Sequence, residues 1–209
     1  MTKKKIGRLC IITNTELQKR FSHEDIVKLA IRGGADMIQL RDKKMSTGEL
    51  VVTAKRIKKL CDKSNVTFIV NDRVDIALIS DADGVHLGKE DIPVSEARKL
   101  LGRNKIIGGT AHNVKEALQV EKDGVDYIGF GHIFPTLTKL KTTQPQGLER
   151  LAEVIRLISI PVLAIGGINT ENVNKVILSG AYGVALIGSV VKSDNPVETV
   201  SELRKIIYG

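Results

Sequence analysis

A regular alternation of short apolar runs and longer amphipathic segments runs through this chain of 209 residues. The apolar runs have the character of buried parallel strands, and the segments between them repeat apolar residues with the period of a helix. Eight strand–helix pairs follow one another with no linker and no change in composition. Such an alternation predicts a parallel sheet covered by helices.

Eight pairs in a chain of this length predict one domain, residues 1–209, folded as a (β/α)8 TIM barrel; an open doubly wound sheet is the alternative. The predicted strands are residues 6–13, 36–40, 67–70, 84–87, 105–109, 126–130, 161–165 and 183–187. The predicted helices are residues 22–32, 47–63, 74–80, 94–101, 114–122, 147–157, 170–178 and 196–207. Ser22 is expected to cap the first helix, with Asp25 three residues later.

Composition and charge indicate which kinds of molecule this chain can bind. Aromatic residues make up only 3% of the chain, too few to serve as stacking platforms for single-stranded nucleic acid. The formal net charge of +8 is spread along the chain, which suits the attraction of anionic substrates or simply a lysine-rich surface. Nucleic acid is therefore not an expected partner, and the sequence is compatible with a homo-oligomer.

Cysteine use and hydropathy predict a cytoplasmic protein. Cys10 and Cys61 form no CxxC pair, so neither a disulfide scaffold nor a zinc site is expected. No apolar run approaches the roughly 18 residues of a membrane span, and the N-terminus lacks the apolar core of a signal peptide.

Polar residues follow nearly every predicted strand, at the end of a barrel where reactive groups lie. Gly166-Gly167 and Gly188-Ser189 follow the last two strands and match a phosphate site in which glycines let backbone N–H groups approach an anion. Thr136, Thr138 and Lys139 follow the sixth strand and could also bond phosphate oxygens. Turn glycines and a polar surface loop are the alternatives.

A second anionic pocket is predicted around Arg41, Lys43 and Lys139. Gln39, Arg41 and Lys43 alternate along an extended segment and so can face one side; surface salt bridges are the alternative. Asp72 and Asp91 end neighbouring strands and suit Mg²⁺, which takes one or two carboxylates plus phosphate oxygens, although each could instead cap a helix. Together these features predict two phosphorylated substrates, one of them a diphosphate.

Seven motifs carry a resemblance that covers essentially the whole chain: QLRDK, ND, VHLGxxD, TAHN, GxxxPTxTK, PVLAIGGI and a terminal IGS. In this order they resemble the thiamine phosphate synthase family. The resemblance implies a TIM barrel that joins hydroxymethylpyrimidine diphosphate to thiazole phosphate, giving thiamine phosphate and pyrophosphate. It also implies a dissociative reaction, in which pyrophosphate leaves before the thiazole nitrogen attacks.

The resemblance assigns roles residue by residue. It implies that the pyrimidine diphosphate contacts Gln39, Leu40, Arg41, Asp42, Lys43, Asn71, Thr110 and Lys139, among which Arg41, Lys43, Thr110 and Lys139 are the catalytic candidates. It implies that thiazole phosphate contacts Thr136, Leu137, Thr138, Gly167, Ile187 and Gly188. Asp72 and Asp91 would ligate Mg²⁺.

Some positions depart from the family pattern. His132 stands where the synthase usually has proline, and this resembles the related thiazole tautomerase, which uses a histidine for proton transfer on a thiazole phosphate carboxylate. Thr110, Lys89 and Gly188 replace the usual serine, glutamine and serine. The alternatives to a synthase are therefore a tautomerase with His132 as its acid–base group, and a non-catalytic regulator that binds a phosphorylated ligand. A packed histidine without chemistry is the simplest explanation of His132.

Overall fold

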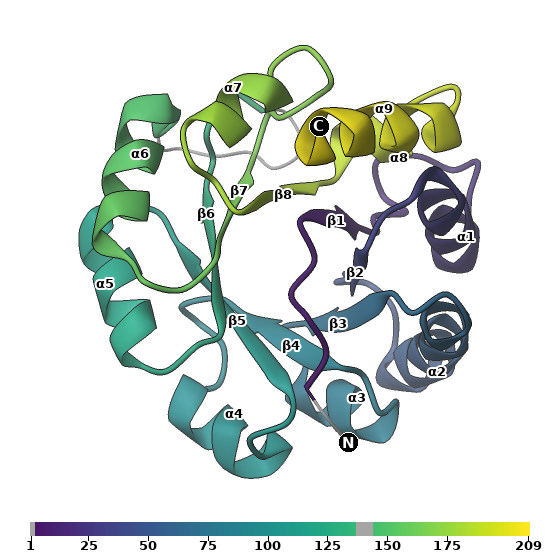
Figure 1. Cartoon of the computed structure of the whole chain (residues 1–209). Coiled ribbons are helices and arrows are strands. Elements are labelled where there is room, and N and C mark those ends of the chain that lie inside the picture. The colour runs from purple at the N-terminus through teal and green to yellow at the C-terminus, as the bar shows by residue number, and fades with distance from the viewer. Residues whose placement is uncertain (1–2, 137–143) are drawn as a thin grey trace.

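The computed structural model describes residues 3–136 and 144–209, which form a closed barrel of parallel strands ringed by helices (Figure 1). The strands are β1 (Leu9–Ile12), β2 (Met37–Leu40), β3 (Thr67–Asn71), β4 (Gly84–Leu87), β5 (Ile106–Ala111), β6 (Tyr127–Gly131), β7 (Val162–Ile165) and β8 (Gly183–Leu186). Pairing of Leu9 on β1 with Val184 on β8 closes the sheet. The predicted TIM barrel is confirmed, and the open sheet is wrong.

The helices lie outside the barrel and agree with the predicted segments to within a few residues. They are α1 (His23–Gly33), α2 (Thr47–Lys63), α3 (Val74–Ile79), α4 (Val94–Leu101), α5 (Val114–Lys122), α6 (Gly147–Leu157), α7 (Val173–Leu178), α8 (Gly188–Val191) and α9 (Pro196–Tyr208). Ser22 caps α1 in a reciprocal capping box with Asp25, as predicted. Within residues 3–136 and 144–209, no helix is long and apolar enough to cross a membrane.

Two differences from the predicted helices have local causes. The four-residue helix α8 was not predicted, because one turn is too short to show a helical period. Helix α7 begins three residues late, since the Asn169 side chain accepts the backbone N–H groups of Glu171 and Asn172 and so holds a turn there.

Two apolar cores stabilise the barrel. The larger lies between the outer faces of the strands and the helices, and the smaller fills the barrel interior around Cys10, Met37, Ile69 and Tyr127. The segment before β1 crosses the amino-terminal end of the barrel, where Ile6 packs against the interior core (Figure 1). The cavity described next lies at the opposite end of the strands.

Candidate active site

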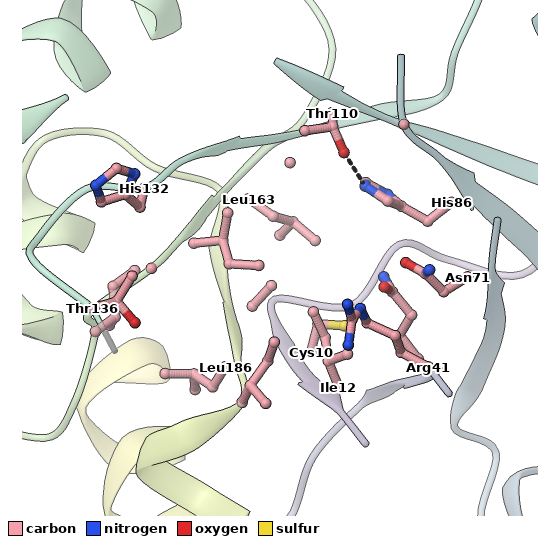
Figure 2. A pocket seen from close by; sticks show the side chains of 18 of the residues that line it. Cys10, Ile12, Arg41, Asn71, His86, Thr110, His132, Thr136, Leu163 and Leu186 are labelled. Atoms are coloured by element: carbon pink, nitrogen blue, oxygen red, sulfur yellow. Dashed lines mark hydrogen bonds between the residues drawn. The ribbon is translucent and has the colours of Figure 1, made fainter. Parts of the chain in front are cut away.

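A cavity of about 590 Å³ lies where the strands end and the following loops begin. Among the residues that the structure describes, twelve predicted site residues line it: Gln39, Arg41, Lys43, Asn71, Asp72, Asp91, Thr110, His132, Thr136, Gly167, Ile187 and Gly188. Figure 2 shows Arg41 and Asn71 on one side of this space and His132 and Thr136 on the other. Residues from separate loops are thus brought into one site, as expected for this fold.

The floor of the cavity is apolar and was not predicted from the sequence. Cys10 and Ile12 from β1 and Leu163 from β7 lie between the two polar sides (Figure 2). Their signal was present but ambiguous, because every second residue of a barrel strand points inward and most such residues only fill the core. Burial raises the pKa of the Cys10 thiol far above its ordinary value, so this residue stays protonated and is a poor nucleophile.

Strand β2 and its loop present the cationic side. Gln39, Arg41 and Lys43 all line the cavity, as their alternate spacing predicted. Leu40 and Asp42 occupy the intervening positions, and their side chains do not line it. Leu40 is 1% exposed in the outer core, and the Asp42 carboxylate contacts His23 on α1. The pleat of the strand turns these two side chains away from the cavity, and the predicted contact of Leu40 and Asp42 with the pyrimidine diphosphate stays a prediction.

Two carboxylates follow neighbouring strands: Asp72 comes directly after β3, and Asp91 lies in the loop after β4. Asp72 is 3.6 Å from the Lys43 ammonium, and the Asp91 carboxylate accepts the backbone N–H of Gly88 at 2.7 Å. Burial and the neighbouring Asp91 raise the pKa of Asp72, against the opposing effects of Lys43 and Arg41. Within residues 3–136 and 144–209, no group of three or more His, Cys, Asp or Glu could enclose a metal ion. This pair instead suits a cation that takes its other ligands from substrate phosphate and water.

A relay, that is, a chain of hydrogen bonds from Gln39 through Tyr127 and His86, ends at the Thr110 hydroxyl. His86 bonds the Thr110 hydroxyl through Nε2 at 2.9 Å (Figure 2). Its Nδ1 bonds the Tyr127 hydroxyl at 3.0 Å. Gln39 also hydrogen-bonds the Tyr127 hydroxyl. When the amide of Gln39 donates to Tyr127 and Tyr127 donates to Nδ1, His86 donates to Thr110. The Thr110 O–H is then left to donate into the cavity.

The loops after β6 and β7 form the opposite side. His132 is 5% exposed, and Thr136 follows it along the loop. Gly167 has φ +70°, and a Cβ there would lie 2.6 Å from the Pro135 carbonyl oxygen, so only glycine allows the two loops to approach this closely. The predicted residues Leu137, Thr138 and Lys139 lie outside the residues that the structure describes.

The loop after β8 completes this side. Ile187 and Gly188 line the cavity together with Ser189, at the start of the short helix α8. The Ser189 hydroxyl is buried and has no hydrogen-bond partner among the residues that the structure describes. A buried hydroxyl of this kind requires an acceptor or donor from a ligand or water, which fits the phosphate site predicted for this loop.

Further polar residues line the cavity beyond the predicted set. Lys89 and Glu90 belong to the loop after β4, beside the two carboxylates. His112 follows β5, and its Nδ1 lies 2.6 Å from the Gly131 carbonyl oxygen, which ties the loop after β5 to the end of β6. His86 lies within β4 and Tyr127 is the first residue of β6. Neither lies at the carboxyl end of its strand, where the sequence predicts reactive groups, so that pattern could not select them.

The arrangement can bind two anions at once. One side carries Arg41, Lys43 and the carboxylate pair, and the other carries Thr136 with the glycine-bearing loops after β7 and β8. The apolar floor between them suits flat, uncharged ring systems. No acid–base pair is required to hold two such molecules in contact, because positioning alone makes the encounter effectively unimolecular.

Several known proteins with similar sequences are described as thiamine-phosphate synthases. The chain is 47% identical over 199 residues to a thiamine-phosphate synthase of Chlorobium luteolum, covering 95% of this chain and 92% of that protein. It is 46% identical to a thiamine-phosphate synthase of Methanocella arvoryzae, covering 95% and 94%. A solved thiamine phosphate pyrophosphorylase from Pyrococcus furiosus superposes with a TM-score of 0.89 at 39% identity, covering 96% of this chain and 95% of that one.

The family model described as thiamine monophosphate synthase matches residues 9–190, which contain every strand and loop that lines the cavity. The superposition on the Pyrococcus furiosus structure agrees with the closed barrel. The chain belongs to the thiamine monophosphate synthase family.

Proposed function

We infer that the chain is a thiamine-phosphate synthase, which condenses hydroxymethylpyrimidine diphosphate with thiazole phosphate and releases pyrophosphate. The observation that carries the inference beyond family membership is the cavity itself. It holds a cationic side next to paired carboxylates and a separate glycine-bearing side, so that a diphosphate and a monophosphate have distinct places.

The residues have separable roles in this proposal. Arg41 and Lys43 bind the diphosphate and stabilise the charge that develops as the bond from the pyrimidine methylene to the diphosphate oxygen breaks. Gln39 and Asn71 orient the pyrimidine ring, and the Thr110 hydroxyl donates to the departing group. The thiazole nitrogen then supplies the electron pair for the new carbon–nitrogen bond, so no protein nucleophile takes part. Lys139 is proposed to join the cationic side.

The second substrate is proposed to occupy the opposite side. Thr136, Leu137, Thr138, Gly167, Ile187 and Gly188 would hold thiazole phosphate there, with backbone N–H groups directed at its phosphate. Asp72 and Asp91 would hold Mg²⁺ together with diphosphate oxygens, and the ion would neutralise charge on the leaving group. The carboxylate pair beside a cationic pocket fits this ion. A cytoplasmic location and a homo-oligomer remain predictions from the sequence.

A second activity is favoured by one observation. His132 lines the cavity on the side proposed for thiazole phosphate, where a histidine could transfer protons on a thiazole phosphate carboxylate.

The deciding experiment measures pyrophosphate and thiamine phosphate from both purified substrates, with Mg²⁺ and with EDTA. Both products are expected to form in the reaction that contains Mg²⁺ and not in the reaction that contains EDTA. Isomerised thiazole without pyrophosphate would indicate the tautomerase, and binding of thiazole phosphate with no product would indicate a regulator.

A further inference from the structure

A buried histidine outside the cavity connects two of the barrel's loops. His23 is the first residue of α1 and is 2% exposed. Its Nδ1 lies 2.7 Å from the hydroxyl oxygen of Thr13, just after β1, and its Nε2 lies 2.9 Å from a carboxylate oxygen of Asp42, just after β2. None of these three side chains lines the cavity.

A neutral His23 ring satisfies the hydrogen bonds of this network. The ionised Asp42 carboxylate only accepts, so His23 donates to it from Nε2. With a neutral ring, Nδ1 then accepts the Thr13 O–H, and every polar atom of the His23 ring has a partner. Thr15 adds a hydroxyl 3.2 Å from the same Asp42 oxygen. Hydrogen bonds from His23 and from backbone N–H groups outweigh the effect of burial and lower the pKa of Asp42 to about 2.

The network ends on the backbone of the loop after β2. The other Asp42 oxygen accepts the N–H groups of Lys44 at 2.7 Å and Met45 at 2.8 Å. The Thr13 hydroxyl oxygen accepts the N–H of Arg41 at 3.2 Å. These bonds fix the main chain on both sides of the segment 41–43, whose Arg41 and Lys43 side chains enter the cavity.

We propose that His23 is a positioning residue of this active site, because through Asp42 and Thr13 it fixes the loop that presents Arg41 and Lys43 to the diphosphate. The proposal deepens the proposed function and rests on it for the identity of the bound group. It also explains why Asp42 lies inside the cationic segment although its side chain is turned away from the cavity.

The test replaces His23 with leucine, which fills similar space without hydrogen bonds, and with glutamine, whose amide can still donate to Asp42. Loosening the loop should lower kcat/KM for the pyrimidine diphosphate by about 10- to 100-fold in His23→Leu, leaving the KM for thiazole phosphate unchanged. His23→Gln should recover most of the loss. Calorimetry measures the binding of inorganic pyrophosphate with Mg²⁺, where no turnover occurs. The affinity should be highest in the native chain, lower in His23→Gln and lowest in His23→Leu.

The matched control is Ser22→Ala, which removes the side-chain cap of the same helix without removing a partner of Asp42. It should lower the melting temperature and leave both KM values unchanged. The proposal is overturned if His23→Leu behaves like this control, or if it changes both KM values equally. Where His23→Leu fails to fold, Thr13→Val breaks the same network at the Arg41 N–H and must give the selective loss.

Calorimetry with inorganic pyrophosphate tests the positioning role of His23 separately from the proposed synthase activity. If the native protein makes no thiamine phosphate but His23→Leu weakens pyrophosphate binding and Ser22→Ala does not, the assigned activity fails and the positioning role stands. If turnover is normal and pyrophosphate binding is equal in all three proteins, the activity stands and the positioning role fails.

Discussion

The Lys43 ammonium lies 3.6 Å from a carboxylate oxygen of Asp72, so the cationic and the acidic groups of the cavity are in direct contact. Lys43 follows β2 and Asp72 follows β3, two neighbouring strands. The ammonium offsets part of the repulsion between Asp72 and Asp91, but the pKa of Asp72 is still raised by burial and by that neighbour. A divalent cation would remove this repulsion more completely.

Asp72→Asn should separate metal binding from stability. Asparagine keeps the tolerance for the positive φ of this position, 64°, while removing one of two like charges. Without metal, the melting temperature should rise by about 2 °C or more, the shift that roughly 1 kcal/mol produces in a chain of this size. The Mg²⁺ concentration for half-maximal activity should increase at least about tenfold. Thermal unfolding in EDTA and a Mg²⁺ titration of turnover measure the two effects, and an unchanged titration would remove Asp72 from the metal site.

Arg41→Ala should abolish most turnover and spare the second substrate. Losing one group that stabilises charge on the departing diphosphate costs about 10²- to 10³-fold in kcat. Thiazole phosphate binding, measured by calorimetry, should be unchanged because Arg41 and Thr136 lie on opposite sides of the cavity (Figure 2). Arg41→Lys is the matched control, since it keeps the charge but not the planar fork. Full activity of Arg41→Ala would contradict its role.

Thr110 provides a test of the hydroxyl that the relay through His86 orients. Thr110→Val keeps the shape but removes the donor, and kcat should fall by about 10²-fold. Thr110→Ser keeps the hydroxyl and should retain activity near that of the native enzyme. Steady-state kinetics of the two variants decide the matter: equal losses would assign the effect to packing rather than to the hydroxyl.

Asp42 should make stability depend on pH in the acid range. Its pKa is lowered from 3.8 to about 2 on folding, so the folded state binds the proton less tightly. The resulting stabilisation, about 2 kcal/mol, is complete well above pH 3.8 and is lost as the pH falls from there through about 2. Urea unfolding of the native chain and of Asp42→Asn between pH 6 and pH 3 measures it. A stability difference that stays constant over this range would contradict the assignment.

The fold could be predicted because its signals are local. Helix α2 was predicted to the residue, since its apolar period is long and Thr47 follows a serine that caps it. The site was predictable where side chains stand at strand ends, as Asp72 and Asp91 do. His86 could not be selected, because its role depends on two partners from other strands, Thr110 and Tyr127, that only the closed barrel brings together.

The directions of the side chains in the segment 39–43 also depend on contacts that the sequence does not show. Motif resemblance treats Gln39 to Lys43 as one binding segment, but the pleat sends alternate side chains to opposite faces. Asp42 therefore pairs with His23, a residue 19 positions earlier, at 2.9 Å. Sequence spacing shows neither that pairing nor the buried hydroxyl of Ser189, since both depend on which loops lie side by side.

His132 decides between the two chemistries that the family resemblance left open. A synthase of this type moves no proton through the protein in its bond-breaking step, whereas a tautomerase requires an acid–base group, worth about 10²- to 10⁴-fold. His132→Ala should therefore leave synthase turnover within roughly tenfold of the native value, a loss smaller than removal of a general acid or base causes.

His132→Gln, which keeps a polar group of similar size, is the control for packing, since the imidazole is 5% exposed. Pyrophosphate release by the native chain and both variants measures the effect. No pyrophosphate release by the native chain, together with proton exchange on the thiazole that both variants lose by more than about 10²-fold, would assign the site to the isomerase reaction.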